Sequence, residues 1–170
     1  FSVGVNCVSV SGKNYPPFIK LASNLGIPVC IISDNDGDTH GEINRQVARL
    51  VREDGLVLNP DCFSLEFLKE TNDIEAELYN ELNIREEIIE SLVLSETKAS
   101  PNERYRDAKK REIEALQDSA IIEKMRDSKA SYAGYLGVIL AQNANGKRIE
   151  ELLPESVIIA FNKVRGWLEL

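Results

Sequence analysis

The chain has 170 residues and is 43% hydrophobic, which is enough apolar material for one packed domain with an appendage. Its formal net charge of -8 argues against a protein that coats a polyanion with its whole surface. No run approaches the roughly 18 apolar residues of a membrane-spanning helix, and no secretory signal pattern opens the chain. The cysteines, Cys7, Cys30 and Cys62, are dispersed and typical of reduced residues in a cytoplasmic protein.

Residues 1–63 are predicted to form an α/β core. Strands are expected at residues 3–10, 27–32 and 56–58, and helices at residues 16–25 and 42–52. Pro16 and Pro17 favour the first turn of the first helix, and Gly26 favours its end. Strands that alternate with helices predict a parallel sheet with right-handed crossovers.

Residues 64–170 are predicted to form a helical region that packs on this core. Their apolar residues recur at helical spacing, first in the stripe of Ile74, Leu78 and Leu82. Further helices are expected at residues 84–92, 103–118, 121–125 and 129–144 and from Pro154 onward, with a break at residues 100–102. A strand is the alternative within 129–144, because Val138 and Ile139 are β-branched.

An acidic turn follows the second apolar run. The sequence there is Asp34-Asn35-Asp36-Gly37-Asp38. In open α/β sheets ligands gather at the carboxyl ends of the strands, where this turn is expected to lie. Two carboxylates held together, as in Asp-x-Asp, are costly unless a cation lies between them. The turn therefore predicts a divalent-metal site formed by Asp34 and Asp36.

Other templates fit this turn less well. A calcium-binding EF-hand loop would need Gly, an aliphatic residue and Glu where Thr39, Gly41 and Arg45 stand. A haloacid-dehalogenase-type phosphatase with Asp34 as nucleophile would need Thr at Asp38. A polar turn in which Asp38 or Thr39 caps the next helix stays open, chiefly for Asp38.

Gly12-Lys13 resembles the end of a phosphate-binding P-loop, but that motif requires Gly at Cys7 and Ser or Thr at Asn14. No nucleotide-binding loop is therefore expected. His40, the single histidine, is interpreted as a solvated loop residue rather than a ligand.

Two later acidic positions could complete a metal site, and a later lysine could act beside it. Glu66 and Glu75 each follow the third predicted strand in a helical pattern and could face the same sheet edge. Lys129 opens the most apolar helix, and a lysine near a metal could stabilise the charge of a phosphoryl transition state. The densest basic cluster is either a phosphate-backbone contact or a solvated face; its members are Arg104, Arg106, Lys109, Lys110 and Arg111, followed by Lys124, Arg126 and Lys129.

These segments together resemble a Toprim (topoisomerase–primase) domain. The resemblance rests on residues 8–13, 25–29 and 34–36, in that order and spacing. The long helical continuation, with residues 72–78 and 128–133, is most similar to the OLD (overcoming lysogenisation defect) family of nucleases. The resemblance implies an α/β fold, with a Toprim or Rossmann-like parallel sheet and a helical C-terminal extension.

The resemblance also implies a function. OLD-family proteins pair an ATPase with a Toprim endonuclease that cuts DNA with two divalent metals, Mg²⁺ or Mn²⁺. Asp34 and Asp36 match the metal ligands, with Asp34 also catalytic, and Lys129 matches the catalytic lysine. Glu75 best matches the downstream acidic ligand, with Glu66 as the runner-up. The implied partners are DNA, the N-terminal ATPase domain that would hold ATP, and a second copy in a homodimer.

The sequence also departs from the family pattern. A Toprim domain opens with a strand that ends in Glu-Gly-x-x-Glu, and no such motif precedes Val3. We therefore expect a fragment without the first strand, which binds metal weakly and has little nuclease activity alone. The competing hypothesis is a degenerate Toprim-like scaffold that docks DNA or protein without catalysis.

Overall fold

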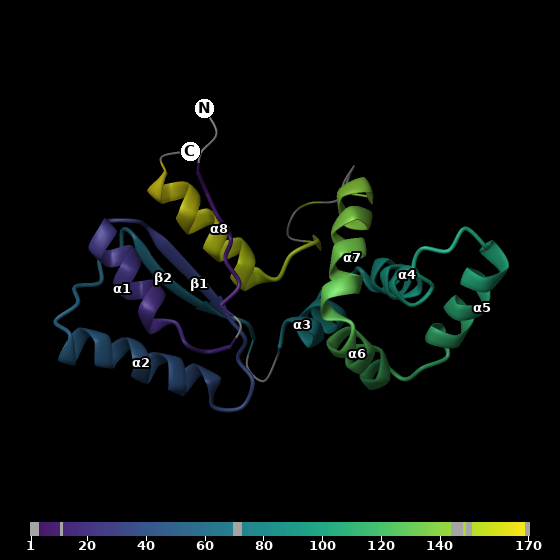
Figure 1. Cartoon of the computed structure of the whole chain (residues 1–170), viewed down its shortest axis with the longest axis horizontal. Helices are drawn as coiled ribbons and strands as arrows, with labels where there is room; N and C mark the ends of the chain where they lie inside the picture. Colours follow the sequence, from purple (N-terminus) through teal and green to yellow (C-terminus); the bar gives the residue numbers. More distant parts are fainter. Residues whose placement is uncertain (1–3, 11, 70–72, 144–147, 149–150, 169–170) are drawn as a thin grey trace. The chain divides into compact units, whose positions relative to one another are not determined.

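The computed structural model describes residues 4–10, 12–69, 73–143, 148 and 151–168. They divide into an α/β unit, residues 1–73 with 155–170, and a helical unit, residues 74–154. Together these described residues hold eight helices and one parallel sheet of two strands (Figure 1). The predicted α/β fold, a parallel sheet with a helical extension, is thereby confirmed.

The α/β unit contains five elements, which are α1 (Pro16–Leu25), β1 (Val29–Ser33), α2 (Thr39–Glu53), β2 (Phe63–Phe67) and α8 (Glu155–Trp167). The two strands run parallel, with Val29 opposite Phe63 and Ser33 opposite Phe67. Both strands therefore end at the same edge of the sheet. Gly26 ends α1 in a left-handed conformation, with φ of 63°, as its position in the sequence predicted.

Alternating side chains divide the sheet into two faces. Ile31 and its partner Leu65 pack with Ile19 of α1 and Leu50 of α2 in one apolar core. On the other face α8 packs against both strands, so the sheet lies between α1 and α2 on one side and α8 on the other (Figure 1). The α/β unit is thus a three-layer arrangement.

Two predicted strands are wrong. Residues 4–10 form neither helix nor strand, and residues 56–58 do not join the sheet. Leu56 and Leu58 are apolar because they pack against the α/β core, not because they pair in a ladder. Pairing with β1 begins only after the turn at residues 59–62, where the amide of Val29 donates to the Cys62 carbonyl oxygen.

The unit boundaries also differ from the predicted division after residue 63. That division falls within β2, and α8 belongs to the α/β unit although it follows the helical unit in sequence. The reason is that α8 covers the sheet face that α1 and α2 leave open.

The helical unit contains α3 (Ile74–Glu81), α4 (Arg85–Glu96), α5 (Glu103–Glu114), α6 (Asp118–Asp127) and α7 (Lys129–Asn143). Residues 129–143 are therefore a helix and not the alternative strand. The most deeply buried side chains of this unit include Ile84, Ile88, Leu92, Ile113, Ile121 and Met125. Asn102 caps α5 by accepting a hydrogen bond from the amide of Tyr105. The start of α5 therefore follows directly after the break predicted at residues 100–102.

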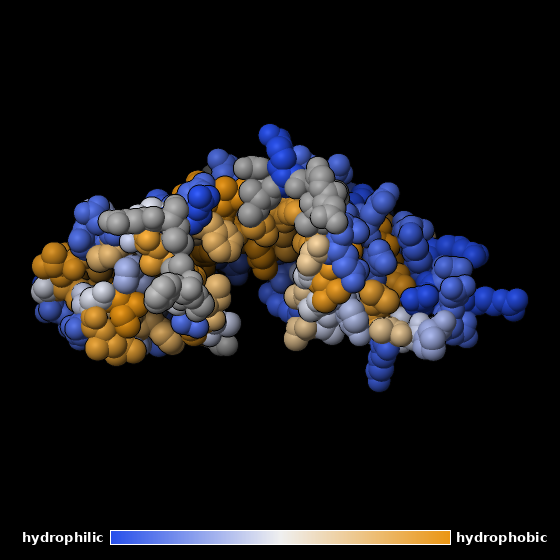
Figure 2. Space-filling model, turned by 90° about the horizontal axis from the view of Figure 1, so that it is seen from above, coloured by the Kyte–Doolittle hydropathy of each residue, from blue (hydrophilic) through white to orange (hydrophobic). Residues whose placement is uncertain are grey.

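The α/β unit exposes several large apolar side chains. Figure 2 shows hydrophobic surface on this unit, at the left of the view. Its exposed apolar residues include Phe18, Leu21, Leu25, Ile27 and Val57. No helix among the described residues is long and apolar enough to cross a membrane.

Candidate functional site

The acidic turn lies at the carboxyl edge of the sheet. β1 ends at Ser33 and β2 ends at Phe67. The amide of Leu68 donates to the Ser33 carbonyl oxygen over 3.0 Å, and the Asn35 side-chain amide donates to the Leu68 carbonyl oxygen over 2.9 Å. The chain after β1 is therefore tethered to the chain after β2, which places Asp34 and the rest of the acidic turn at this edge.

Asp36 faces both solvent and the next helix. Its side chain is 56% exposed, and its Oδ1 accepts a hydrogen bond of 2.7 Å from the hydroxyl of Thr39, the first residue of α2. The Lys13 Nζ lies 3.8 Å from the same oxygen. Gly37, with φ of 54°, provides the left-handed residue that this turn requires. Asp34 is half-buried.

Asp38, the third carboxylate of the turn, is engaged elsewhere. Its Oδ2 accepts a hydrogen bond of 2.6 Å from Arg45, and this contact holds the pKa of Asp38 below its usual value. Asp38 stands at the N-cap of α2 but makes no capping hydrogen bond with its side chain. Gly41 leaves space for the Asp38 carboxylate, because a Cβ at position 41 would lie only 2.5 Å from Asp38 Oδ1.

Lys13 is a basic residue of this edge to which the sequence pattern assigns no role. Gly12 turns the chain with φ of 109°, and α1 begins three residues after Lys13 at Pro16. The Tyr15 hydroxyl donates to Ser33 Oγ over 3.2 Å, which fixes the start of α1 beside the end of β1. The sequence feature that indicates this location is the position of Lys13 just before a helix that begins at the carboxyl edge. Its partial P-loop motif does not indicate it.

The sequence pattern predicted a helix at Glu66, and this prediction is wrong. Glu66 lies in β2. The register pairs it with Ile32, and its carboxylate accepts hydrogen bonds from Ser64 Oγ and from Lys163 Nζ, the latter at 2.5 Å. The period-two alternation of Phe63, Leu65 and Phe67 was too short to be recognised as a strand. Glu66 therefore lies on the sheet face that α8 covers.

Cys30 lies near this group on the same face. Burial raises the pKa of the Cys30 thiol, and the negative charge of Glu66 raises it further. Cys7, Cys30 and Cys62 are all free thiols. Cys30 is thus a half-buried thiol whose surroundings favour its protonated form.

The helical unit brings two predicted site residues together. Lys129, the first residue of α7, places its Nζ 3.2 Å from Glu75 Oε2 of α3. The Glu75 side chain is 3% exposed and that of Lys129 57% exposed. Glu75 Oε2 makes no hydrogen bond, so the ion pair is the contact that compensates its burial. Each unit thus holds two of the four predicted residues, Asp34 and Asp36 in one and Glu75 and Lys129 in the other.

The carboxylates of Asp34 and Asp36 fit part of a divalent-metal site. Carboxylate oxygens are the ligands that Mg²⁺ and Mn²⁺ prefer. Within the described ranges no group of three or more His, Cys, Asp or Glu side chains could hold a metal ion. The ring of His40 contacts that of Phe67 in a tilted arrangement, with 4.4 Å between the ring centroids, and His40 also contacts Asn44. Asp34 and Asp36 thus offer carboxylate oxygens at this edge, and no third such side chain in the described part of the chain completes a group with them.

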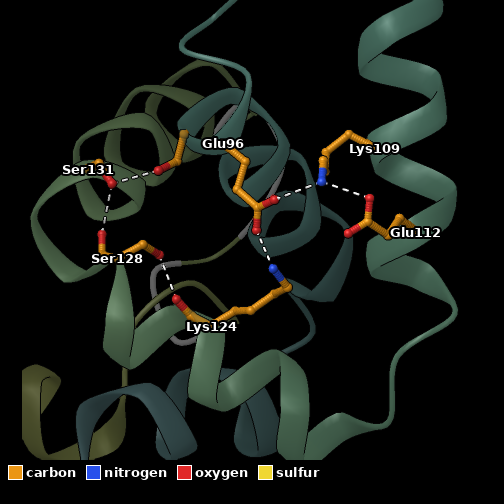
Figure 3. A network of polar contacts seen from close by, with 7 residues as sticks. Glu96, Lys109, Glu112, Lys124, Ser128 and Ser131 are labelled. Atoms are coloured by element: carbon orange, nitrogen blue, oxygen red, sulfur yellow. Dashed lines mark hydrogen bonds and ion pairs between the residues drawn. The ribbon is translucent and has the colours of Figure 1, made fainter.

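Several lysines of the predicted basic cluster pair with glutamates within the helical unit. Glu96 of α4 accepts hydrogen bonds from Lys109 of α5 and Lys124 of α6, and Lys109 also contacts Glu112 (Figure 3). Lys110 lies 3.8 Å from Glu114. Lys109 and Lys124 therefore link α5 and α6 to α4 through Glu96, whereas Lys110 pairs within α5. Part of the basic cluster is a structural network rather than a solvated face.

Residues 2–36 match the family model for the overcoming lysogenization defect protein-like TOPRIM domain. The matched stretch includes Lys13, Asp34 and Asp36 and ends within the acidic turn. The resemblance predicted from the sequence is confirmed for this stretch. No curated protein and no solved structure matches the chain. A Toprim match indicates a metal-binding module of the nuclease or primase type.

Proposed function

From the OLD-like Toprim match of residues 2–36, we propose that this chain is the metal-dependent, DNA-cleaving module of an OLD-family, ATPase-linked endonuclease. The observation that carries the proposal is the position of Asp34 and Asp36. They lie in the matched stretch and at the carboxyl edge of a parallel sheet, where α/β proteins bind their ligands. The reaction is the hydrolysis of a phosphodiester bond.

Each predicted residue has a distinct role in this proposal. Asp34 and Asp36 would hold Mg²⁺ or Mn²⁺ through their carboxylate oxygens. The bound cations would activate water and stabilise the leaving oxygen. Lys129 provides a positive charge for the phosphoryl group. Glu75, which the resemblance matches to the downstream acidic metal ligand, lies in the helical unit, where its buried carboxylate forms the ion pair with Lys129.

Glu66 is the weaker choice for that further acidic residue. Its carboxylate already accepts hydrogen bonds from Lys163 and Ser64 under α8. A metal ligand there would have to give up both contacts. The proposed partners rest on the family resemblance: they are DNA, an ATPase domain that holds ATP, and a second copy of the chain. The proposed cytoplasmic location rests on the dispersed cysteines.

The test is a nicking assay on supercoiled plasmid with the protein in excess. We expect slow conversion to open circles only with Mg²⁺ or Mn²⁺, and no conversion by Asp34→Asn, Asp36→Asn or Lys129→Met. Asp38→Asn is the matched control, because Asp38 is paired with Arg45 and should not be needed. Equal nicking by Asp36→Asn and the wild type would refute the proposed site.

A second function, a scaffold that docks DNA or protein without catalysis, is favoured by one observation. The described residues include no group of three side chains able to hold a metal ion. If that candidate is correct, the chain binds DNA equally well with and without divalent cations, and the plasmid stays supercoiled. Cation-dependent nicking that needs Asp34 would exclude it.

A further inference from the structure

Lys13 lies beside the acidic turn, and its ion pair with Asp36 is long. Its Nζ lies 3.8 Å from Asp36 Oδ1, and the two side chains are 41% and 56% exposed. Exposed ion pairs of this length contribute little to stability, because solvent screens them. The contact therefore does not explain why a lysine is held at this edge.

Other basic side chains of the α/β unit make closer contacts. Arg45 lies 2.6 Å from Asp38, Lys20 2.8 Å from Asp54, and Lys163 2.5 Å from Glu66. Lys13 differs from these three because its ammonium is loosely held. It can leave Asp36 at small cost.

The backbone nevertheless fixes where Lys13 stands. The left-handed Gly12 precedes it, and the hydrogen bond between Tyr15 and Ser33 ties the following residues to the end of β1. Its backbone is thus anchored at the carboxyl edge, while its half-exposed ammonium makes only the long contact with Asp36 among the described residues. The ammonium of such a lysine can exchange one anionic partner for another.

We propose that Lys13 binds a backbone phosphate of DNA at the Asp34–Asp36 site, moving from Asp36 to the phosphate when a divalent cation occupies the carboxylates. A cation on Asp36 repels an ammonium 3.8 Å from the same oxygen, and the negative phosphate attracts it. This inference rests on the proposed function, because it requires that the acidic turn bind metal and meet DNA.

The proposal predicts opposite effects on two ligands. Lys13→Gln removes a competing cation from Asp36, so Mn²⁺ affinity should rise about two- to five-fold. The same change removes a phosphate contact, so DNA affinity should fall about three- to ten-fold, with the salt dependence reduced by about one unit of slope. A residue that only supported the fold would lower both affinities.

The experiment measures Mn²⁺ binding and the anisotropy of a short fluorescent DNA duplex across a salt series, with Ca²⁺ present to limit cleavage. Lys13→Arg should restore DNA binding, because arginine also contacts phosphate. Lys20→Gln is the matched control, since Lys20 is 45% exposed but paired with Asp54, and it should change neither affinity. A melting curve for each variant checks that the fold is kept.

The outcomes separate this inference from the proposed function. Cation-dependent DNA binding by the wild type that Lys13→Gln leaves unchanged overturns the role of Lys13 alone. A fall in both Mn²⁺ and DNA affinity does the same. Wild-type protein that binds neither Mn²⁺ nor DNA overturns the proposed function, and this inference with it.

Discussion

Three neighbouring carboxylates have three different environments in the acidic turn. Asp34 is half-buried, Asp36 contacts Thr39 and Lys13, and Asp38 is bound by Arg45. The position of the turn could be predicted, because the apolar run before it has to end at a sheet edge. The pairing of Asp38 with Arg45 could not be predicted, because it depends on the helical spacing between the two residues and on the space above Gly41.

At the residue scale, Gly37→Ala should destabilise the protein by about 1 kcal/mol. Gly37 has φ of 54°, a conformation that a Cβ disfavours. Gly134→Ala is the control, because Gly134 lies in α7 with no atom near its Cβ position; it should stabilise by about 0.5–1 kcal/mol. Urea unfolding measures both. Equal effects of the two changes on the free energy of unfolding would contradict the claim that the turn requires glycine at position 37.

At the scale of elements, long segments with clear start or stop signals were predictable and short ones were not. α1 follows from Pro16 and Gly26, and β1 follows from its apolar run. β2 was missed because its five residues mix one charged and one polar residue with three apolar ones, which also fits the start of a helix. Its partner across the sheet, and not its own sequence, makes it a strand.

The Glu96 network joins three helices, α4, α5 and α6, and gives an element-scale prediction with a pH dependence. Burial opposes the charged form of Glu96, but the hydrogen bonds from Lys124 and Lys109 outweigh it and lower the pKa. Since the folded pKa is the lower one, this stabilisation is complete above the ordinary value of 4.5 and is lost as the pH falls through the folded value.

Glu96→Gln should therefore cost about 1 kcal/mol at pH 7 and little at acidic pH, where the wild-type carboxyl is protonated as well. Urea unfolding at a series of pH values measures the difference. Glu114→Gln is the control, because Glu114 makes a long, exposed contact with Lys110. A cost for Glu96→Gln that is independent of pH would show that the ion pairs do not hold α5.

At the scale of the whole molecule, the chain forms two units with separate cores. Ile19, Ile31 and Leu50 belong to one core, and Ile88 and Leu92 belong to the other. The sequence indicated an α/β part followed by helices, but it could not show that α8 returns to the α/β unit. That return depends on an open sheet face, which is a property of the fold and not of any local pattern.

Separate cores predict separate responses to core mutations. Leu50 is 3% exposed and Ile88 0%, so replacing either with Ala should cost about 2–5 kcal/mol. Leu50→Ala should speed amide hydrogen exchange in α1, β1, α2, β2 and α8, and Ile88→Ala should speed it in α3 to α7. Mass spectrometry of exchanged peptides locates the change. Faster exchange throughout the chain in either variant would argue for a single cooperative unit.

The most direct test of the central claim, that Asp34 and Asp36 form a divalent-metal site, is a titration of Mn²⁺ followed by electron paramagnetic resonance. The wild type should lower the free Mn²⁺ signal, and Asp34→Asn or Asp36→Asn should weaken binding at least about ten-fold, because each removes a ligand. Asp38→Asn should bind within about three-fold of the wild type, because Arg45 already holds Asp38. Unchanged binding by Asp36→Asn, or a loss confined to Asp38→Asn, would contradict the account.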